Sequence, residues 1–324
     1  ITNKIEVDQL KSYILTGVND FYVTGGTYSG GTLTLNRQNG SVVITGFTTG
    51  STQLYEVGSG SSSVQLVNVS GSAIGDYSVV SGGLNNTSKA DYSTVSGGQN
   101  NTSSGDFSFI GGGFRNTSGD QSSTTSGGYC NLSNCAGSTV SGGRQNTSIG
   151  GFSTVSGGWN NTSSGLYSTV SGGYTNTASG SSSIVGGGLQ NTSSGQHSTV
   201  SGGRLNKSIC CNSTVSGGYC NTSISSSATV SGGVCNTSSG DYSFIGGGSG
   251  NTINNLLGGV LGGCNNKVVN DRSFIVGNSI TTSCPNTTYV NCLSIINLPS
   301  SSAGLPSGSL WYDSSDSCTV KYVP

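Results

Sequence analysis

The sequence predicts an all-β chain that folds as a parallel β-solenoid with 15-residue coils. A Gly pair recurs at a constant spacing, as at Gly82-Gly83 and Gly97-Gly98, and continues to Gly262-Gly263 without an insertion, which defines 13 units. A β-branched residue stands two places before every pair, and an Asn stands four places after the first Gly. Helical repeats run above about thirty residues, whereas a unit of this length fits one coil of a solenoid.

The composition excludes several other classes of protein. Of the 324 residues, 186 are Gly, Ser, Thr or Asn, while 31% are hydrophobic and 7% are charged. So few helix-forming and apolar residues exclude a conventional helical core. Eleven Lys plus Arg against twelve Asp plus Glu give a net charge of −1, which argues against nucleic-acid binding. No apolar run reaches membrane-spanning length, so we expect no membrane insertion.

The column before the Gly pair predicts the interior of the solenoid. Its side chains should point inward from a strand, together with the Ser two positions earlier, because strand residues share a face with period two. The members are Val80, Val95, Ile110, Thr125, Val140, Val155, Val170, Val185, Val200, Val215, Val230, Ile245 and Val260.

The Asn column predicts a structural ladder. We expect each Asn to take a left-handed corner conformation, with stacked amides that donate to and accept from the amides above and below. The Gly pair permits a corner with positive φ. The ladder residues are Asn86, Asn101, Asn116, Asn131, Asn146, Asn161, Asn176, Asn191, Asn206, Asn221, Asn236, Asn251 and Asn266.

Two further columns are rich in aromatic residues. A narrow coil cannot hold both inside, and exposed aromatic stripes usually mark an interface. We expect at least one stripe to pack against sister chains, and the second, which includes Arg144 and Arg204, to contact sugar rings of a host surface. The first stripe contains Tyr77, Tyr92, Phe107, Phe152 and Tyr167, and the second contains Phe114, Tyr129, Trp159, Tyr174 and Tyr219.

Three parts are predicted along the chain: a β-rich module over residues 1–70, the solenoid over 71–280 and a cap over 281–324. In the first part, 32–36 and 41–45 alternate around an Asn-Gly turn, which predicts a hairpin. The last part leaves the register of the repeats and contains all four Pro residues. A cap is expected because an open last coil presents unpaired strand edges.

Ten Cys residues in so polar a chain favour an oxidising, extracellular location. Cys220 and Cys235 occupy the same place in consecutive coils, about one strand spacing apart, which is within reach of a disulfide. Free thiols are the alternative, and a zinc site is disfavoured because the Cys spacing is wrong. The further disulfide candidates are Cys130 with Cys135 and Cys284 with Cys292.

Many ladder Asn residues begin an Asn-x-Ser/Thr sequon. An amide buried in a ladder cannot carry a sugar, so we expect those sequons to be silent. The better candidates for glycosylation lie outside the ladder, at Asn68, Asn212 and Asn286.

No residue pattern indicates catalysis, a metal or a cofactor. His197 is the single histidine, and it occupies an aromatic column far from any acidic residue in sequence, so a Ser-His-Asp triad is not predicted. The Asp residues recur too irregularly for a calcium-binding roll. A depolymerase fibre needs paired carboxylates, which the repeats lack. We therefore expect a protein that is not an enzyme.

The unit Ser-x-Val-Ser-Gly-Gly-x-x-Asn-Thr-Ser-Ser-Gly resembles the head repeats of trimeric autotransporter adhesins, and the resemblance covers about residues 72–280. It implies a left-handed parallel β-roll and a side-by-side homotrimer. The same repeat style occurs in trimeric fibres of phages and large viruses. The segments 20–28, 46–50 and 304–324 resemble parts of such fibres, which favours a viral fibre over a bacterial surface adhesin.

We therefore expect a structural and adhesive fibre protein, extracellular or on a virion surface, whose partners are itself and a host glycan or receptor. An ice-binding solenoid is the alternative, because a Thr column precedes the core column at Thr94, Thr139, Thr154, Thr169, Thr199, Thr214 and Thr229. That column is interrupted at Val79, Phe109, Ile184, Phe244 and Gly259.

Overall fold

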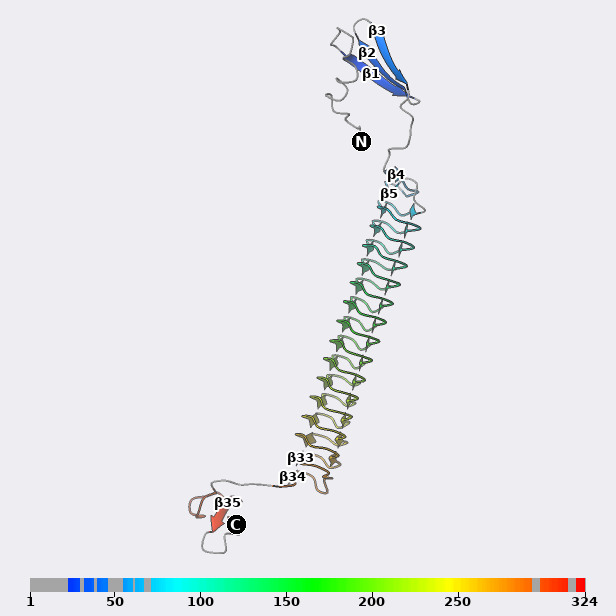
Figure 1. Cartoon of the computed structure of the whole chain (residues 1–324). Helices are drawn as coiled ribbons and strands as arrows, with labels where there is room; N and C mark the ends of the chain where they lie inside the picture. Colours follow the sequence, from blue (N-terminus) through cyan, green and yellow to red (C-terminus); the bar gives the residue numbers. More distant parts are fainter. Residues whose placement is uncertain are drawn as a thin grey trace. The chain divides into compact units, whose positions relative to one another are not determined.

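The computed structural model describes residues 23–29, 32–37, 40–45, 55–60, 62–66, 71–292, 298–313 and 319–323. These residues are all-β, and no helix occurs among them. Most of them form a parallel β-solenoid in which one coil corresponds to one sequence repeat, as the sequence predicts (Figure 1).

Each coil contains two short strands that belong to two different parallel sheets. The first sheet is 14-stranded. It consists of β6 (Ser72–Ala73), β8 (Thr87–Ser88), β10 (Thr102–Ser103), β12 (Thr117–Ser118), β14 (Leu132–Ser133), β16 (Thr147–Ser148), β18 (Thr162–Ser163), β20 (Thr177–Ala178), β22 (Thr192–Ser193), β24 (Lys207–Ser208), β26 (Thr222–Ser223), β28 (Thr237–Ser238), β30 (Thr252–Ile253) and β32 (Lys267–Val268).

The second sheet faces the first across the interior. It includes β5 (Val64–Leu66), β7 (Val79–Val80), β9 (Thr94–Val95), β11 (Phe109–Ile110), β13 (Thr124–Thr125), β15 (Thr139–Val140), β17 (Thr154–Val155), β19 (Thr169–Val170), β21 (Ile184–Val185), β23 (Thr199–Val200), β25 (Thr214–Val215), β27 (Thr229–Val230), β29 (Phe244–Ile245), β31 (Gly259–Val260), β33 (Phe274–Val276) and β34 (Thr288–Val290). A further strand, β4 (Tyr55–Val57), precedes β5.

The register between coils is constant, because each strand residue pairs with its equivalent in the next repeat. In the first sheet Thr102 pairs with Thr117, and in the second sheet Val140 pairs with Val155. A third contact is a parallel bridge just after the Gly pair, as between Tyr129 and Arg144. Because neighbouring parallel strands lie about 4.8 Å apart, equivalent residues of successive coils form columns along the solenoid.

The interior is narrow and half polar. The column of Val and Ile side chains is fully buried, and the Ser column that shares its face is buried with it. Thr125 interrupts the apolar column, so the buried apolar residues form one cluster from Ala73 to Ile110 and another from Val140 to Ile275. The Thr125 hydroxyl is satisfied by the carbonyl oxygen of Thr117 at 3.2 Å.

Pairs of Ser hydroxyls connect the two sheets across this interior. Ser88 Oγ lies 2.6 Å from Ser93 Oγ, and Ser163 Oγ lies 2.7 Å from Ser168 Oγ. Ala178 replaces the first Ser of one pair, and the hydroxyl of its counterpart Ser183 has no hydrogen-bond partner among the described residues. The polar half of the interior is thus a set of hydroxyl pairs with occasional gaps.

The Asn column forms a ladder, but its hydrogen bonds run mainly to the backbone. Asn161 Nδ2 donates to the carbonyl oxygens of Gly157 (3.0 Å) and Gly173 (2.9 Å). Its Oδ1 accepts the backbone N–H of Asn176 at 2.9 Å. A direct bond between ladder amides occurs from Asn101 Nδ2 to Asn86 Oδ1 at 3.1 Å. The expected amide-to-amide ladder is therefore corrected to an amide-to-backbone ladder.

The prediction that the ladder Asn takes the left-handed corner conformation is wrong. The residue before it takes that conformation. Asn85 has φ 55°, and the second Gly of the pair, Gly83, has φ 86°. The ladder Asn is buried and reaches both Gly carbonyls, while its neighbour makes the bend. At the other turn of the coil, Tyr77 is left-handed with φ 58°.

The stack of coils continues to β34, which pairs in parallel with β33. Near this end Ile280 and Tyr289 pack against the buried column. The backbone N–H groups of Ser283 and Cys284 donate to the Tyr289 hydroxyl at 2.9 and 2.7 Å. Separately, β35 (Leu310–Asp313) and β36 (Thr319–Tyr322) form an antiparallel hairpin.

A separate unit near the start of the chain contains β1 (Val23–Ser29), β2 (Thr32–Arg37) and β3 (Gly40–Thr45). These strands form an antiparallel sheet in the order β1-β2-β3. The pairs Thr32 with Thr45 and Arg37 with Gly40 bound the β2–β3 hairpin, which the sequence predicts.

Candidate functional site

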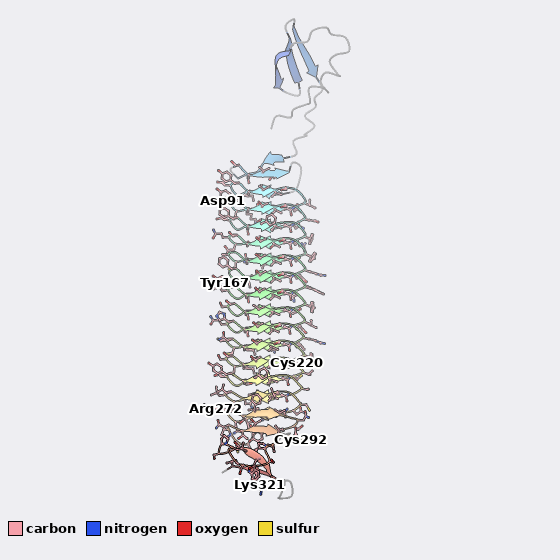
Figure 2. The ribbon with its side chains drawn as sticks, turned by 90° about the vertical axis from the view of Figure 1, so that its left-hand side faces the viewer. Asp91, Tyr167, Cys220, Arg272, Cys292 and Lys321 are labelled. Carbon is pink, nitrogen blue, oxygen red and sulfur yellow. The ribbon has the colours of Figure 1, made fainter. Side chains whose placement is uncertain are left out.

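The surface features of the solenoid are concentrated in its turns. A coil with two facing strands has two turns, and these lie at opposite edges of the roll. We call the edge built from the Gly-pair turns, such as 111–116, the arginine edge. The edge built from the other turns, such as 104–107, is called the aspartate edge. Figure 2 shows Asp91 and Tyr167 along one side of the ribbon and Cys220 toward the other.

The first predicted aromatic stripe lies on the aspartate edge. The rings of Tyr77, Tyr92 and Phe107 stack with centroids 5.1 and 4.9 Å apart, and Phe152 stacks on Tyr167 at 5.5 Å. Phe107 and Phe152 are 56% and 58% exposed. The stripe therefore consists of ordered ring stacks that still present apolar surface to solvent.

Backbone geometry directs these rings outward. Each residue of the stripe is left-handed, which lets its N–H donate to a carbonyl of the preceding coil: Tyr92 to Asp76 at 2.8 Å and Phe107 to Asp91 at 3.0 Å. A left-handed conformation costs a residue with a Cβ about 1 kcal/mol or more. The hydrogen bond and the ring stacking offset that cost, so the edge is ordered without a Gly at most of its corners.

Carboxylates line the same edge beside the rings. Asp91 Oδ1 accepts the backbone N–H of Asp76 at 2.8 Å, and Asp241 Oδ1 accepts that of Ser226 at 3.1 Å. This role was not predicted, although the position of Asp one residue before the aromatic column signals it. Asp76, Asp91 and Asp106 recur in three consecutive coils, so like charges are stacked at one strand spacing.

The second predicted stripe lies on the arginine edge and contains cations between its rings. The Arg144 guanidinium carbon lies 5.2 Å from the Tyr129 ring centroid and 5.1 Å from that of Trp159. Phe114 stacks on the other side of Tyr129 at 5.3 Å, and Tyr174 meets Trp159 edge-on at 4.9 Å. The faces of Tyr129 are thus covered by column neighbours, which disfavours the expected stacking of sugar rings there.

Two other arginines complete this edge. Arg115 lies over the Phe114 ring at 5.0 Å, and Arg204 lies over Tyr219 at 5.6 Å. Arg115, Arg144 and Arg204 are all exposed. Guanidinium groups held over aromatic rings keep their N–H donors at the rim of the edge, where an anionic partner can reach them.

The nine cysteines that the structure describes are free thiols, and Cys318 lies outside the described residues. Cys220 and Cys235 occupy one column of the arginine edge in consecutive coils. Desolvation, followed by the effect of the neighbouring Cys220 thiol, raises the pKa of Cys235. Cys130 and Cys135 are separated by β14 and lie at opposite edges, so the structure does not bring that pair together. Cys284 and Cys292 are both exposed, and their disulfide and that of Cys220 with Cys235 stay predictions.

The sequons divide by burial. Ladder Asn residues are buried, with both Nδ2 donors used. Asn212 and Asn286 are exposed, and Asn68 lies outside the described residues. A second exposed group was not predicted: in Asn-Asn-Thr units the residue before the ladder Asn also begins a sequon. Asn85 and Asn160 are exposed members of this group.

The described residues include few other groups that are typical of catalytic or metal sites. His197 is exposed on the aspartate edge, where other coils carry Tyr or Phe. No group of three His, Cys, Asp or Glu side chains able to hold a metal ion occurs among the residues that the structure describes. In the same residues, no helical segment has the length and apolar character needed to cross a membrane.

No protein-family model matches this chain, and no curated protein matches its sequence.

Proposed function

We propose that this chain is the shaft of a structural and adhesive fibre that works as a side-by-side homotrimer. The observation that carries the proposal is the pair of ordered aromatic edges on a solenoid whose interior is too narrow to bury them. Phe152 and Tyr167 are 58% and 57% exposed, although they are stacked and held by a fixed backbone. Thin solenoids gain apolar burial by packing against other chains.

The regular interior supports a role in reach and rigidity. Each coil from Asn86 to Asn266 repeats the ladder hydrogen bonds, as from Asn146 Nδ2 to Gly142 and from Asn161 Nδ2 to Gly157. Coils that contact only their neighbours extend a fold by simple addition. We propose a location outside the cell or on a virion surface, where such a spacer presents its outer surface to a host. The proposal assigns the chain no reaction and no cofactor.

The repeats resemble the head repeats of trimeric autotransporter adhesins. This resemblance supports the proposal that the solenoid is a left-handed roll and that three chains form the fibre. A bacterial trimeric surface adhesin shares that architecture and differs in the particle that carries it. The particle from which the chain is isolated distinguishes the two proposals, because a viral fibre is a virion component and a bacterial adhesin is a cell-surface component.

Light scattering combined with size-exclusion chromatography tests the trimer. We expect a mass of three chains for the wild type and a lower mass for a Phe152→Ser/Tyr167→Ser variant. Ser occupies the same left-handed position at Ser122 and Ser182, so the corner tolerates this change. Ile184→Thr, which alters an exposed apolar residue on the outward face of the second sheet, where most coils carry Thr, serves as the control. A wild type that is monomeric at all concentrations refutes the proposal.

Ice binding is a second candidate, favoured by a second Thr column that was not predicted. The outward residue of the first sheet is Thr in most coils, so each sheet presents its own Thr column. Leu132, Lys207 and Lys267 interrupt the new column, and Phe109 and Ile184 interrupt the other. A measurable thermal hysteresis supports this candidate, and its absence eliminates it.

A further inference from the structure

The charges of the solenoid are segregated between its two edges. Between residues 71 and 292, all of which the structure describes, every acidic residue lies in a turn of the aspartate edge. These residues are Asp76, Asp91, Asp106, Asp120, Asp241 and Asp271. That edge also carries Lys89 and Arg272, whereas the arginine edge carries Arg115, Arg144 and Arg204 and no acidic residue over the same range.

One opposite-charge pair lies at the same level of the solenoid without touching. Asp106 precedes β11 and Arg115 follows it, so both belong to one coil but to opposite edges. Both are exposed, and neither makes an ion pair with a described residue. A single chain therefore cannot pair these two charges, whereas two chains aligned in register can.

We propose that copies of this chain assemble in register, with the aspartate edge of one copy against the arginine edge of the next. The inference rests on the proposed homotrimer and names the surfaces that build it. Contacts between two different surfaces are heterologous, and a ring of three such contacts uses every edge once and leaves none open. Charge complementarity then fixes which edges meet and in which register.

The stacked carboxylates give the pairing an energetic reason. Asp91 and Asp106 lie one strand spacing apart, and like charges so placed are destabilising. An arginine from a neighbouring copy relieves that repulsion.

Aromatic residues of the aspartate edge and of the arginine edge lie in the same coils. Phe152 and Trp159 belong to one coil, and Tyr167 and Tyr174 belong to the next. Edge-to-edge packing therefore brings aromatic surface of one copy against aromatic surface of its neighbour. An anionic polymer is the competing occupant, but it fits the arginine edge alone and leaves Phe152 exposed on the other edge.

A charge swap tests the pairing. We expect Asp106→Arg and Arg115→Asp each to weaken assembly on the order of tenfold or more at low salt, because each places like charges across the contact. The double variant Asp106→Arg/Arg115→Asp restores opposite charges and should recover most of the association. Within one chain the two residues lie at opposite edges, so recovery requires a contact between copies. Light scattering over a concentration series measures each association.

Circular dichroism confirms that each variant keeps its β-structure, and both changed side chains are exposed. Salt gives a second readout: wild-type assembly should weaken as ionic strength rises, since these charges are at the surface. A wild type that is trimeric and unaffected by salt and by both single changes overturns the edge pairing but leaves the proposed fibre intact. A double variant as weak as the single variants also overturns it. A monomeric wild type refutes the trimer itself.

Discussion

Asn86 accepts the backbone N–H of Asn101 through its Oδ1 atom at 3.0 Å, although the two residues belong to different coils. The same bond recurs in every coil and reaches Asn266, which accepts from Ile280 at 3.1 Å. Since the Nδ2 of each Asn also donates hydrogen bonds to two Gly carbonyl oxygens, one side chain connects three stretches of backbone. The regular rise of the solenoid depends on this connection.

Replacement of a central ladder residue should be strongly destabilising. Asn161→Ala leaves the Gly157 and Gly173 carbonyls and the Asn176 N–H without their partner. We expect a loss of about 3–5 kcal/mol in the free energy of unfolding, or a transition that splits in two as the halves uncouple. Urea denaturation followed by circular dichroism measures it.

The adjacent residue supplies the control for that experiment. Asn160 is exposed and left-handed at φ 56°, a conformation that Gly adopts without strain. Asn160→Gly should therefore change the stability by less than about 1 kcal/mol. Equal effects of the two substitutions would contradict the ladder.

The Ser pairs predict opposite outcomes for two chemically identical substitutions. Ser168→Ala removes the partner of Ser163 and should cost about 1–2 kcal/mol, because a buried hydroxyl is left unsatisfied. Ser183→Ala removes a hydroxyl that already has no partner among the described residues, so it should be neutral or stabilising by about 1 kcal/mol. Thermal denaturation of the two variants compares them, and a larger loss at Ser183 contradicts the assignment.

The two glycines of a pair should differ sharply in tolerance to Ala. A Cβ at Gly158, where φ is 86°, lies 2.2 Å from the Gly173 oxygen and 2.6 Å from Asn161 Nδ2. A Cβ at Gly157 meets nothing within 4 Å. Gly158→Ala should cost about 3 kcal/mol or more, and Gly157→Ala less than about 1 kcal/mol. Soluble yield and melting temperature report the difference, and equal tolerance refutes the assigned geometry.

The neighbouring thiols of Cys220 and Cys235 predict that the reactivity of Cys235 toward alkylation depends on pH. Because the pKa of Cys235 is raised by desolvation and then by Cys220, its nucleophilic thiolate forms at a higher pH than in an ordinary thiol. Cys220→Ala removes the second cause, so the pKa of Cys235 should fall. Its alkylation by iodoacetamide at about pH 8 should then accelerate. Mass spectrometry of the Cys235 peptide measures the rate, and an unchanged pH profile refutes the coupling.

Periodicity made the columns predictable but not the contacts within them. The spacing of the repeats identified the buried Val residues and the constant register, because equivalent positions in a stack share one environment. It did not reveal that Asn86 bonds to backbone or that Asn85 makes the left-handed bend, since the residue before the ladder Asn varies from coil to coil and its type gives no sign of a left-handed backbone. The charge segregation was missed for a related reason: Asp106 and Arg115 occupy irregular columns, and their edges follow from the two turns of a coil.

The central claim is that each sequence repeat advances the chain by one strand spacing, and distances between spin labels test it most directly. A nitroxide amino acid placed at Thr139 and paired with a second at Thr199, Thr214 or Thr229 leaves the native cysteines unchanged. These sites share the outward column of the second sheet. We predict distances of about 19, 24 and 29 Å, which increase by one strand spacing per coil. Distances that increase unevenly, or by much more than about 5 Å per coil, contradict the solenoid.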